Sequence, residues 1–228
     1  MKDLTIVIPV YNEDRMVIDK LYDKLKKLDC KVLFVDDGDT IGLPQHIPHV
    51  SYWPNKGYGH ALKYGILRCN TDLVLTMDGD GQHAPEDVQK LYKVYKMVEG
   101  CRMVVGCRWG LREALRRKIG RKILNFIASL LAGHYLVDLN SGMRIMDRRM
   151  VVGYMPILCN VFSFTTSLTM AVVGDGHKHV WLPINVRDRQ FGKSHVRVIK
   201  HGFITLYYIL WIGLALRTRR LRAWIRGS

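Results

Sequence analysis

Two carboxylates stand two residues apart around a glycine in the stretch LTMDGDGQHAPED (residues 75–87), just after an apolar segment. That segment, DLVLTM, is typical of a buried strand, and side chains at positions i and i+2 of an extended chain share one face. Asp78 and Asp80 would then repel each other unless a cation lay between them, and Gly79 would let another group approach closely. The pattern favours a divalent metal site. A polar turn before a helix that begins at Pro85 is the alternative, but it leaves the aspartates unexplained.

The first half of the chain alternates between apolar and amphipathic segments. Strands are predicted at LTIVIPV, KVLFVDD, HVSYW, DLVLTM and CRMVVGCR, with helices at EDRMVIDKLYDKLKKL, GYGHALKYGILRC and PEDVQKLYKVYKMV. This alternation predicts an α/β fold with a mostly parallel, doubly wound sheet. The first strand is followed by neither a dinucleotide-binding glycine pattern nor a P-loop.

Polar residues follow four of the predicted strands, and ligands of parallel sheets bind beyond the carboxyl ends of the strands. They are Tyr11, Asn12 and Glu13, then Asp36 and Asp37, then residues 78–83, and then Arg108. Their convergence predicts a ligand site at one edge of the sheet. The simpler alternatives are an N-cap at Asn12, a turn at Asp36–Gly38 and a solvated charge at Arg108.

The positive charge is concentrated in the second half. Residues 1–113 hold 16 of the 35 Lys+Arg and 16 of the 20 Asp+Glu, so residues 114–228 hold 19 and 4, which accounts for the whole net charge of +15. Such a surface attracts anionic membranes, phosphorylated substrates or nucleic acids. We expect no nucleic acid, because the basic residues are not interleaved with the stacking aromatics of a recognised module.

Length and cysteine usage set the broad class. A chain of 228 residues suffices for one domain with an appendage. The five cysteines are scattered and odd in number, without a C-x-x-C pair, which predicts a reducing compartment and no disulfide framework. The segment MKD runs straight into the first predicted strand, so no secretory leader is expected.

The second half reads differently from the first. REALRRKIGRKILNFIASLLAG predicts a basic helix that becomes apolar, VDLNSGMRIMDRRMV a loop that leads into a short helix, FSFTTSLTMAVVG a buried helix and HKHVWLPINVRDR a strand. The helix FSFTTSLTMAVVG contains no acidic residue. After Glu113 the only acids are Asp138, Asp147, Asp175 and Asp188.

The carboxyl-terminal segment combines an apolar run with a basic end. FITLYYILWIGLAL (residues 203–216) would span about 21 Å as a helix, short of the roughly 30 Å core of a bilayer. RTRRLRAWIR follows it, with five Arg and Trp224. We therefore predict a domain at residues 1–195 and an amphipathic, membrane-associating helical segment at residues 196–228. The alternative is a buried helix followed by a solvated basic tail.

Eight motifs occur in one order across about 190 residues, and together they resemble the inverting glycosyltransferases of family 2, with the GT-A fold, above all the dolichyl- and polyprenyl-phosphate mannose or glucose synthases. The motifs are VIPVYNE, VDDGDT, NKGYGHALKYGI, MDGDGQHAPE, VVGCRW, RKIGRKILN, DLNSGMR and RQFGKS. The chain departs from the family pattern at Asp39, Gly120 and His195, which affects the expected ribose or base contacts and the charge of the last loop.

The resemblance implies a role for each matching residue. It places a nucleotide-sugar donor at Pro9, Tyr11, Glu13, Val35, Asp37, Asp78, Gly79, Asp80, Gln82, Arg189 and Lys193. It implies Mg²⁺ or Mn²⁺ at Asp78, Asp80 and Gln82. It implies an acceptor phosphate at Arg108, Arg117 and Ser141, so that the catalytic residues would be Asp78, Asp80, Arg108 and Arg117.

The acidic residues of the second half of the chain help to predict the chemical class of the acceptor. Transfer to a hydroxyl needs a carboxylate base, whereas a phosphate with a second pKa of about 6 is largely dianionic at pH 7 and needs none. Asp138 is a weak candidate base that we expect to orient the SGMR loop instead. The sequence thus predicts transfer of a hexose, from GDP-mannose or next UDP-glucose, to polyprenyl or dolichyl phosphate at the cytoplasmic face of a membrane, with peripheral or monotopic attachment.

Four alternatives remain from the residues alone. They are a family 2 transferase acting on a hydroxyl of a lipid or saccharide, a sugar nucleotidyltransferase, a basic nucleic-acid-binding protein, and a membrane adaptor without catalysis. PVYNEDR stands where a nucleotidyltransferase is expected to carry a glycine-rich basic loop.

Overall fold

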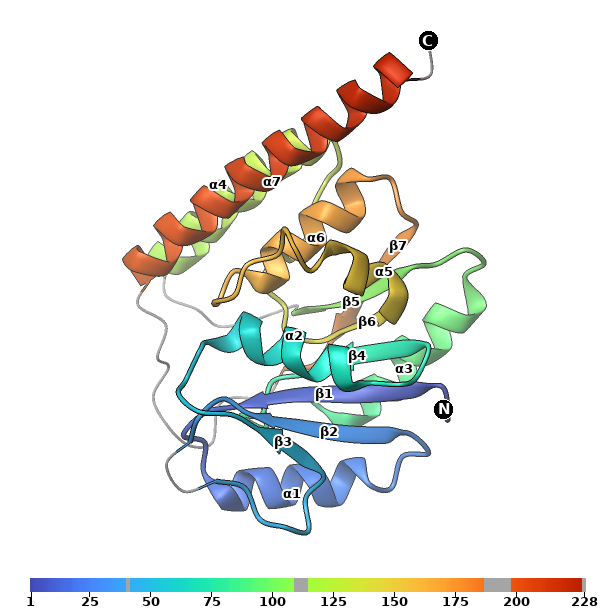
Figure 1. Cartoon of the computed structure of the whole chain (residues 1–228), viewed down its shortest axis with the longest axis vertical. Coiled ribbons are helices and arrows are strands. Elements are labelled where there is room, and N and C mark those ends of the chain that lie inside the picture. Colours follow the sequence, from blue (N-terminus) through green and yellow to red (C-terminus); the bar gives the residue numbers. More distant parts are fainter. Residues whose placement is uncertain (40–41, 109–114, 187–197, 227–228) are drawn as a thin grey trace.

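A seven-stranded mixed sheet forms the centre of the molecule (Figure 1). The computed structural model describes residues 1–39, 42–108, 115–186 and 198–226. The strands are β1 (Leu4–Val10), β2 (Lys31–Asp36), β3 (His49–Ser51), β4 (Leu73–Thr76), β5 (Met103–Arg108), β6 (Arg144–Asp147) and β7 (His179–Ile184). Their order across the sheet is β3-β2-β1-β4-β6-β5-β7.

All strand pairs are parallel except those of β6, which runs antiparallel to both β4 and β5. The prediction of a mostly parallel sheet is confirmed. In VDLNSGMRIMDRRMV the expected short helix is present from Arg148, but the segment before it is not only a loop, because β6 lies there. β6 holds four residues that start with Arg144, a charged residue that obscures the apolar strand pattern. Its pairing with β4 and β5 is what defines it as a strand.

Helices cover both faces of the sheet. They are α1 (Arg15–Leu25), α2 (Tyr58–Arg68), α3 (Pro85–Met97), α4 (Leu115–Ala132), α5 (Arg148–Tyr154), α6 (Phe164–Gly174) and α7 (Val198–Arg226). Helices α1 and α3 pack on one face, and α2 and α4 to α7 pack on the other. Helix α6 is buried along its whole length, as predicted for an apolar segment without acids.

The amino end of α1 differs from the prediction in one respect. Asp14, not Asn12, caps the helix, because the Asp14 side chain accepts a hydrogen bond from the Met16 N–H. Asn12 lies before the cap with a φ of 52°, in the left-handed region that Asn tolerates better than most residues.

Helix α7 is one 29-residue helix. It packs against α4 and α6, and Ile209, Ile212 and Leu216 are buried in the same apolar cluster as α6. Among the described residues, no helix is both long and apolar enough to cross a bilayer. One side of α7 is therefore buried in the protein, as the alternative of a buried helix predicts. Attachment of its other side to a membrane stays a prediction.

Candidate active site

The acidic motif lies in a turn just beyond β4. The strand ends at Thr76, and residues 79 and 80 form a turn, so the extended-chain argument for a shared face does not apply to Asp78 and Asp80. Gly79 is close to β1, since a Cβ added there would lie 3.2 Å from the Pro9 carbonyl oxygen. The group that approaches this glycine is therefore the end of β1.

Two neighbouring side chains hold the carboxylate of Asp78. The Tyr58 hydroxyl donates to Asp78 Oδ1 at 2.9 Å, and His83 Nε2 lies 3.3 Å from Asp78 Oδ2. Burial by itself raises the pKa of Asp78, but the hydrogen bonds and charge from His83 and Tyr58 outweigh it, and the net pKa lies below its ordinary value. Asp78 is therefore ionised at neutral pH, and its side chain keeps 34% exposure.

The segment 138–143 packs directly over this carboxylate. A Cβ added at Gly142 would collide with the carboxyl group of Asp78, so only glycine fits there. Thr76 Oγ1 donates to the Gly142 carbonyl at 2.7 Å, and Gly106 N–H donates to the Met143 carbonyl at 2.9 Å. The close approach of two chain segments therefore explains the glycine of the SGMR motif.

Arg144 anchors this segment from below. Its guanidinium is fully buried and donates to the carbonyls of Ser141 and Thr165 and to Thr169 Oγ1. Burial lowers the pKa of Arg144 to about 10, which leaves it charged at neutral pH. Asp138 also contacts this loop, since its Oδ1 accepts from the Asn140 N–H at 3.3 Å. Arg144 is a second support of the SGMR loop, which the sequence did not indicate.

Asp138 forms a closed ion pair with Arg108. Arg108 Nε donates to Asp138 Oδ2 at 2.9 Å and its NH2 donates to Oδ1 at 2.8 Å, while the Arg108 backbone N–H also reaches Oδ2. Asp138 is almost completely buried, and burial alone raises its pKa, but the Arg108 guanidinium brings the net pKa below its ordinary value. Asp138 is buried and bonded on both oxygens, and its lowered pKa makes the carboxylate a weaker base than usual. It is therefore a poor general base.

The other described acids of the second half are also engaged. Asp147 caps α5 through the Met150 N–H and pairs with Arg102. Asp175 accepts from the Tyr154 hydroxyl. Asp188 lies outside the described residues. Helix α6, whose amino end reaches the site through a hydrogen bond from Thr166 Oγ1 to Asn140 Oδ1, supplies hydroxyls and no carboxylate.

The aspartates after β2 have different surroundings. Asp36 Oδ1 accepts the Asp39 N–H, and burial raises the pKa of Asp36. The carboxylate of Asp37 accepts from the Tyr52 hydroxyl at 2.6 Å and from the N–H groups of Lys56 and Gly57. Asp37 therefore fixes the loop before α2, in addition to any contact with a nucleotide base.

The remaining residues of the predicted donor pocket fall into two groups. Pro9 and Val35 are buried in the sheet, with Val35 packed against Gly65 of α2, whereas Tyr11 is 42% exposed beyond β1. Glu13 and Gln82 are half-buried, and the Gln82 N–H donates to Asp80 Oδ1 at 3.1 Å. Their contacts with a donor stay predictions.

The predicted phosphate-binding residues are only partly described. The Ser141 side chain is fully buried and its hydroxyl donates to the Gly106 carbonyl. The hydroxyl proton therefore already has an acceptor within the protein. Arg117 lies in the first turn of α4, and its side chain is outside the described part of the chain. Arg189 and Lys193 lie outside the described residues altogether.

The residues of the acidic motif fit a divalent cation in an open site. No group of three or more His, Cys, Asp or Glu side chains converges as a metal cage within the described ranges. Mg²⁺ and Mn²⁺ do not need one, because they are commonly held by one or two carboxylates together with substrate phosphates. An ionised, partly exposed Asp78 close to Asp80 suits that arrangement.

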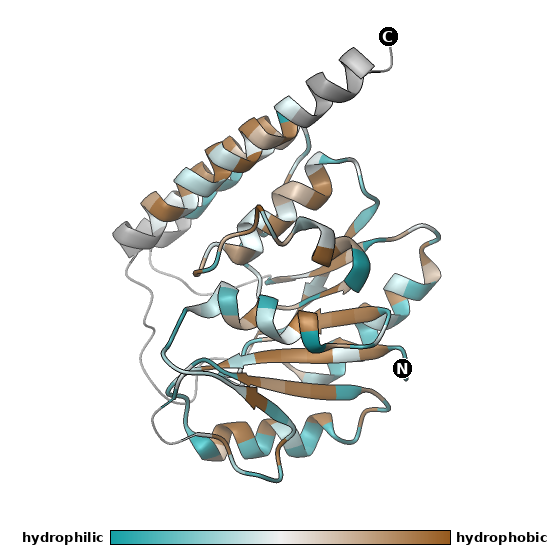
Figure 2. Cartoon of the chain, viewed as in Figure 1, coloured by the Kyte–Doolittle hydropathy of each residue, from teal (hydrophilic) through white to brown (hydrophobic). Residues whose placement is uncertain are grey.

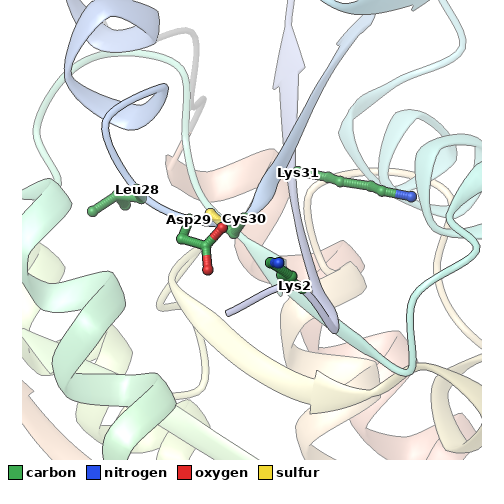
Figure 3. Close-up of a pocket in the computed structure, with 5 residues that line it drawn as sticks. All are labelled: Lys2, Leu28, Asp29, Cys30 and Lys31. Carbon is green, nitrogen blue, oxygen red and sulfur yellow. The ribbon is translucent and has the colours of Figure 1, made fainter.

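A separate pocket of about 360 Å³ lies at the opposite end of the sheet (Figure 3). It is lined by Lys2, Leu28, Asp29, Cys30 and Lys31, at the amino ends of β1 and β2. It contains none of the residues predicted to carry chemistry.

Sequence reasoning missed three residues of the site. Tyr58 and His83 hold Asp78, and Arg144 holds the loop above it. Tyr58 lies in the motif NKGYGHALKYGI and Arg144 in the motif DLNSGMR. Their membership of these motifs is the feature of the sequence that could have identified them. His83 lies in the turn after Asp78, where a histidine gives no distinctive pattern, and its side chain is only 3% exposed.

The fold resembles solved glycosyltransferases of the GT-A type. It matches glucosyl-3-phosphoglycerate synthase from Mycobacterium tuberculosis in complex with Mn²⁺, uridine diphosphate and phosphoglyceric acid, with a TM-score of 0.73, 16% identity and coverage of 92% of this chain and 78% of that chain. The complex of that enzyme with Mn²⁺, UDP-glucose and glycerol 3-phosphate gives a TM-score of 0.68, 17% identity and coverage of 92% and 79%. These similarities establish the fold.

The chain belongs to glycosyl transferase family 2, whose family model matches residues 5–152. This confirms the resemblance inferred from the ordered motifs. An uncharacterized protein of Methanocaldococcus jannaschii is 32% identical over 155 residues, which cover 62% of this chain and 63% of that protein. Undecaprenyl-phosphate 4-deoxy-4-formamido-L-arabinose transferase of Photorhabdus laumondii is 25% identical over 236 residues, covering 92% and 66%. The chain thus spans about two thirds of the length of these relatives.

Proposed function

We propose that this glycosyltransferase moves a sugar from a nucleotide sugar to the phosphate of a polyprenyl or dolichyl lipid, with inversion and with a divalent metal. The observation that carries this proposal is the closed pair of Asp138 and Arg108. Together with the engaged Asp147 and Asp175 and an acid-free α6, it leaves no evident base among the described residues of the second half. An acceptor that arrives already ionised needs no base.

In the proposed step, an oxygen of the acceptor phosphate attacks the anomeric carbon of the donor sugar. The new carbon–oxygen bond forms as the bond to the nucleoside diphosphate breaks on the opposite side, and the diphosphate leaves with the bonding electron pair. No proton has to move, because the attacking oxygen is anionic. The catalytic demand is therefore to hold two anions near each other.

The chain's own residues would meet that demand with charge. Asp78 and Asp80, with Gln82, would hold Mg²⁺ or Mn²⁺, which when bound neutralises the charge building on the leaving diphosphate. Arg108 and Arg117 would bind the acceptor phosphate near the Ser141 loop. Arg189 and Lys193 would contact the donor phosphates, and Tyr58 and His83 would keep the Asp78 carboxylate in place.

The donor is proposed from the resemblance. GDP-mannose is our first choice and UDP-glucose the second. The relative from Photorhabdus laumondii is named for transfer of a formamido-arabinose to undecaprenyl phosphate, so that sugar class belongs among the donors to be tested. We place the reaction at the cytoplasmic face of a membrane, where a lipid phosphate would be accessible.

A transfer assay tests the proposal. Purified protein in detergent receives radiolabelled GDP-mannose or UDP-glucose, a polyprenyl phosphate and Mg²⁺ or Mn²⁺, with EDTA and Asp80→Ala as controls. We expect label in the organic phase, lost in both controls. Metal-dependent hydrolysis of the donor without transfer would contradict the lipid-phosphate acceptor and favour a hydroxyl acceptor. Absence of donor binding, hydrolysis and transfer would contradict the catalytic role.

A further inference from the structure

Helices α4 and α7 run side by side across one end of the molecule (Figure 1). They approach closely, since a Cβ added at Gly213 of α7 would lie 3.1 Å from Leu131 Cβ of α4. Both helices also pack against α6. The pair therefore forms an outer layer over α6, with one side facing the protein.

The inward sides of the two helices are apolar, as a protein core requires. Ala128 and Ala132 of α4 and Ile209, Ile212 and Leu216 of α7 are buried in the cluster that contains α6. Successive members are three or four residues apart, so they form one stripe on each helix.

The outward sides are apolar as well, which is unusual for a helix that faces water. On α4 the exposed large side chains are Ile119, Ile123, Phe126 and Leu130. On α7 they are Phe203, Tyr207, Leu210, Trp211 and Leu214. They are between 48% and 71% exposed, and they make up nine of the sixteen exposed large hydrophobic side chains in the described part of the chain. Apolar segments along α7 are also visible in Figure 2.

The two outward stripes belong to one surface. Each is offset by two positions from the buried stripe of its helix, as Phe126 is from Ala128 and Leu210 is from Ile212. At 3.6 residues per turn, two positions correspond to about 200°, the opposite side of a helix. Because both buried stripes face α6, both exposed stripes point away from it. We call these nine residues the α4/α7 face.

The charged residues of α4 and α7 all have the same sign. The sequences of α4 and α7 contain no Asp or Glu. They contain basic residues at the start of α4, in LRRKIGRK, and at the end of α7, in RTRRLRAWIR. The α4/α7 face therefore lies on two helices whose charged residues are all basic, including the exposed Lys122 and Arg217. Its Tyr207 and Trp211 are side chains that suit a boundary between hydrocarbon and water.

We propose that the α4/α7 face docks on the surface of an anionic lipid leaflet, with both helices lying in the plane of the interface. Apolar side chains would enter the headgroup and acyl boundary while the flanking Arg and Lys contact lipid phosphates. A second copy of this chain fits less well, because two such faces would bring together like charges without a single acid between them. The surface is thus wider than the carboxyl-terminal segment predicted from the sequence.

This inference rests on the proposed function, because a transferase that uses a lipid acceptor has to reach a membrane surface. It extends that function by naming the surface that makes the contact. Arg117, which is predicted to bind the acceptor phosphate, lies in the first turn of α4, two positions before Ile119. Docking through α4 would therefore place the acceptor-binding end of that helix at the depth of the lipid phosphates. The carboxyl-terminal segment alone would not fix the active site in this way.

Vesicle flotation with the whole chain tests the proposal. The vesicles contain phosphatidylcholine alone or with about a third phosphatidylglycerol. The variants are Phe126→Ser/Leu130→Ser on α4 and Phe203→Ser/Leu214→Ser on α7. The matched control is Leu67→Ser/Met97→Ser, which removes two exposed apolar side chains on α2 and α3, outside this face. We expect the wild type and the control to float with anionic vesicles, and each face variant to lose roughly tenfold or more of its partitioning.

Three results would overturn the proposal. They are a wild type that stays with the buffer, a face variant of α4 that floats like the wild type, and a wild type whose lipid-free dimer becomes monomeric on Phe126→Ser/Leu130→Ser. Circular dichroism melts show whether each variant folds. Transfer to detergent-dispersed polyprenyl phosphate is measured separately: a protein that floats but transfers nothing contradicts the proposed function alone, and one that transfers but does not float contradicts docking alone.

Discussion

Asp78 and Asp138 are two carboxylates at the same edge of the sheet, and the structure treats them in opposite ways. Both have pKa values below their ordinary range. Asp78 is held by a phenol and an imidazole and keeps a third of its side chain exposed. Asp138 is enclosed by a guanidinium on both oxygens. A carboxylate held by weak donors remains able to bind a cation, whereas one closed by an arginine serves to position that arginine.

The largest expected effect comes from removing the open carboxylate. Asp78→Asn should lower transfer by at least about 100-fold, because the charge that would hold the metal on the leaving diphosphate is lost. The measurement is the initial transfer rate together with Mn²⁺-dependent binding of the nucleoside diphosphate. Asp72→Asn, an exposed aspartate at the other end of β4, is the control that should leave both unchanged. Wild-type binding of Mn²⁺ by Asp78→Asn would contradict the metal site.

The packing above Asp78 offers the next test. Gly142→Ala introduces a methyl group where the Asp78 carboxylate lies, and relief of that clash should displace the carboxylate and lower transfer by roughly 10- to 100-fold. Gly153→Ala on α5 meets no atom within 4 Å and should act like the wild type. Equal rates for the two variants would show that the position of Asp78 is not critical.

Removing a single donor to Asp78 should have a smaller effect. Tyr58→Phe deletes the hydroxyl that donates at 2.9 Å and should weaken the metal-dependent binding of donor by roughly tenfold, as for other residues that orient a metal ligand. Tyr64→Phe on the same helix removes a hydroxyl with only a long contact, at 3.5 Å, to the Ser51 carbonyl. If the two variants bind the donor equally, Tyr58 does not act through Asp78.

The closed carboxylate should matter least for turnover and most for stability in acid. Asp138→Asn should raise the acceptor KM by at most roughly tenfold through loss of Arg108 positioning, whereas loss of a general base would cost about 100- to 10,000-fold in kcat. A collapse of kcat with normal KM would therefore restore the hydroxyl-acceptor alternative.

The same variant has a defined pH dependence. The folded-state pKa of Asp138 is depressed, so the stability from its pair with Arg108 is complete above the unfolded pKa of about 3.9 and is lost as pH falls through the folded value. The melting temperatures of wild type and Asp138→Asn should therefore differ at pH 7 and converge below about pH 4. A constant difference across that range would mean that the ionised pair does not contribute to folding.

Much of this protein follows from its sequence. Apolar segments alternating with amphipathic ones specify strands and covering helices, because the period of the side chains matches each element, and the carboxyl ends of parallel strands meet at one edge. That reasoning found Asp78, Asp80, Asp37 and Arg108 at the edge where the structure places them. The ordered motifs also identified the family correctly.

Other features required the tertiary structure, since they depend on contacts between distant segments. Strand β6 exists because β4 and β5 pair with it, and Tyr58 reaches Asp78 across 20 positions. Gly142 must be glycine because another segment's carboxylate lies against it. Likewise, the sequence shows that α7 is apolar, but only packing against α4 and α6 determines which of its sides is buried and which remains exposed.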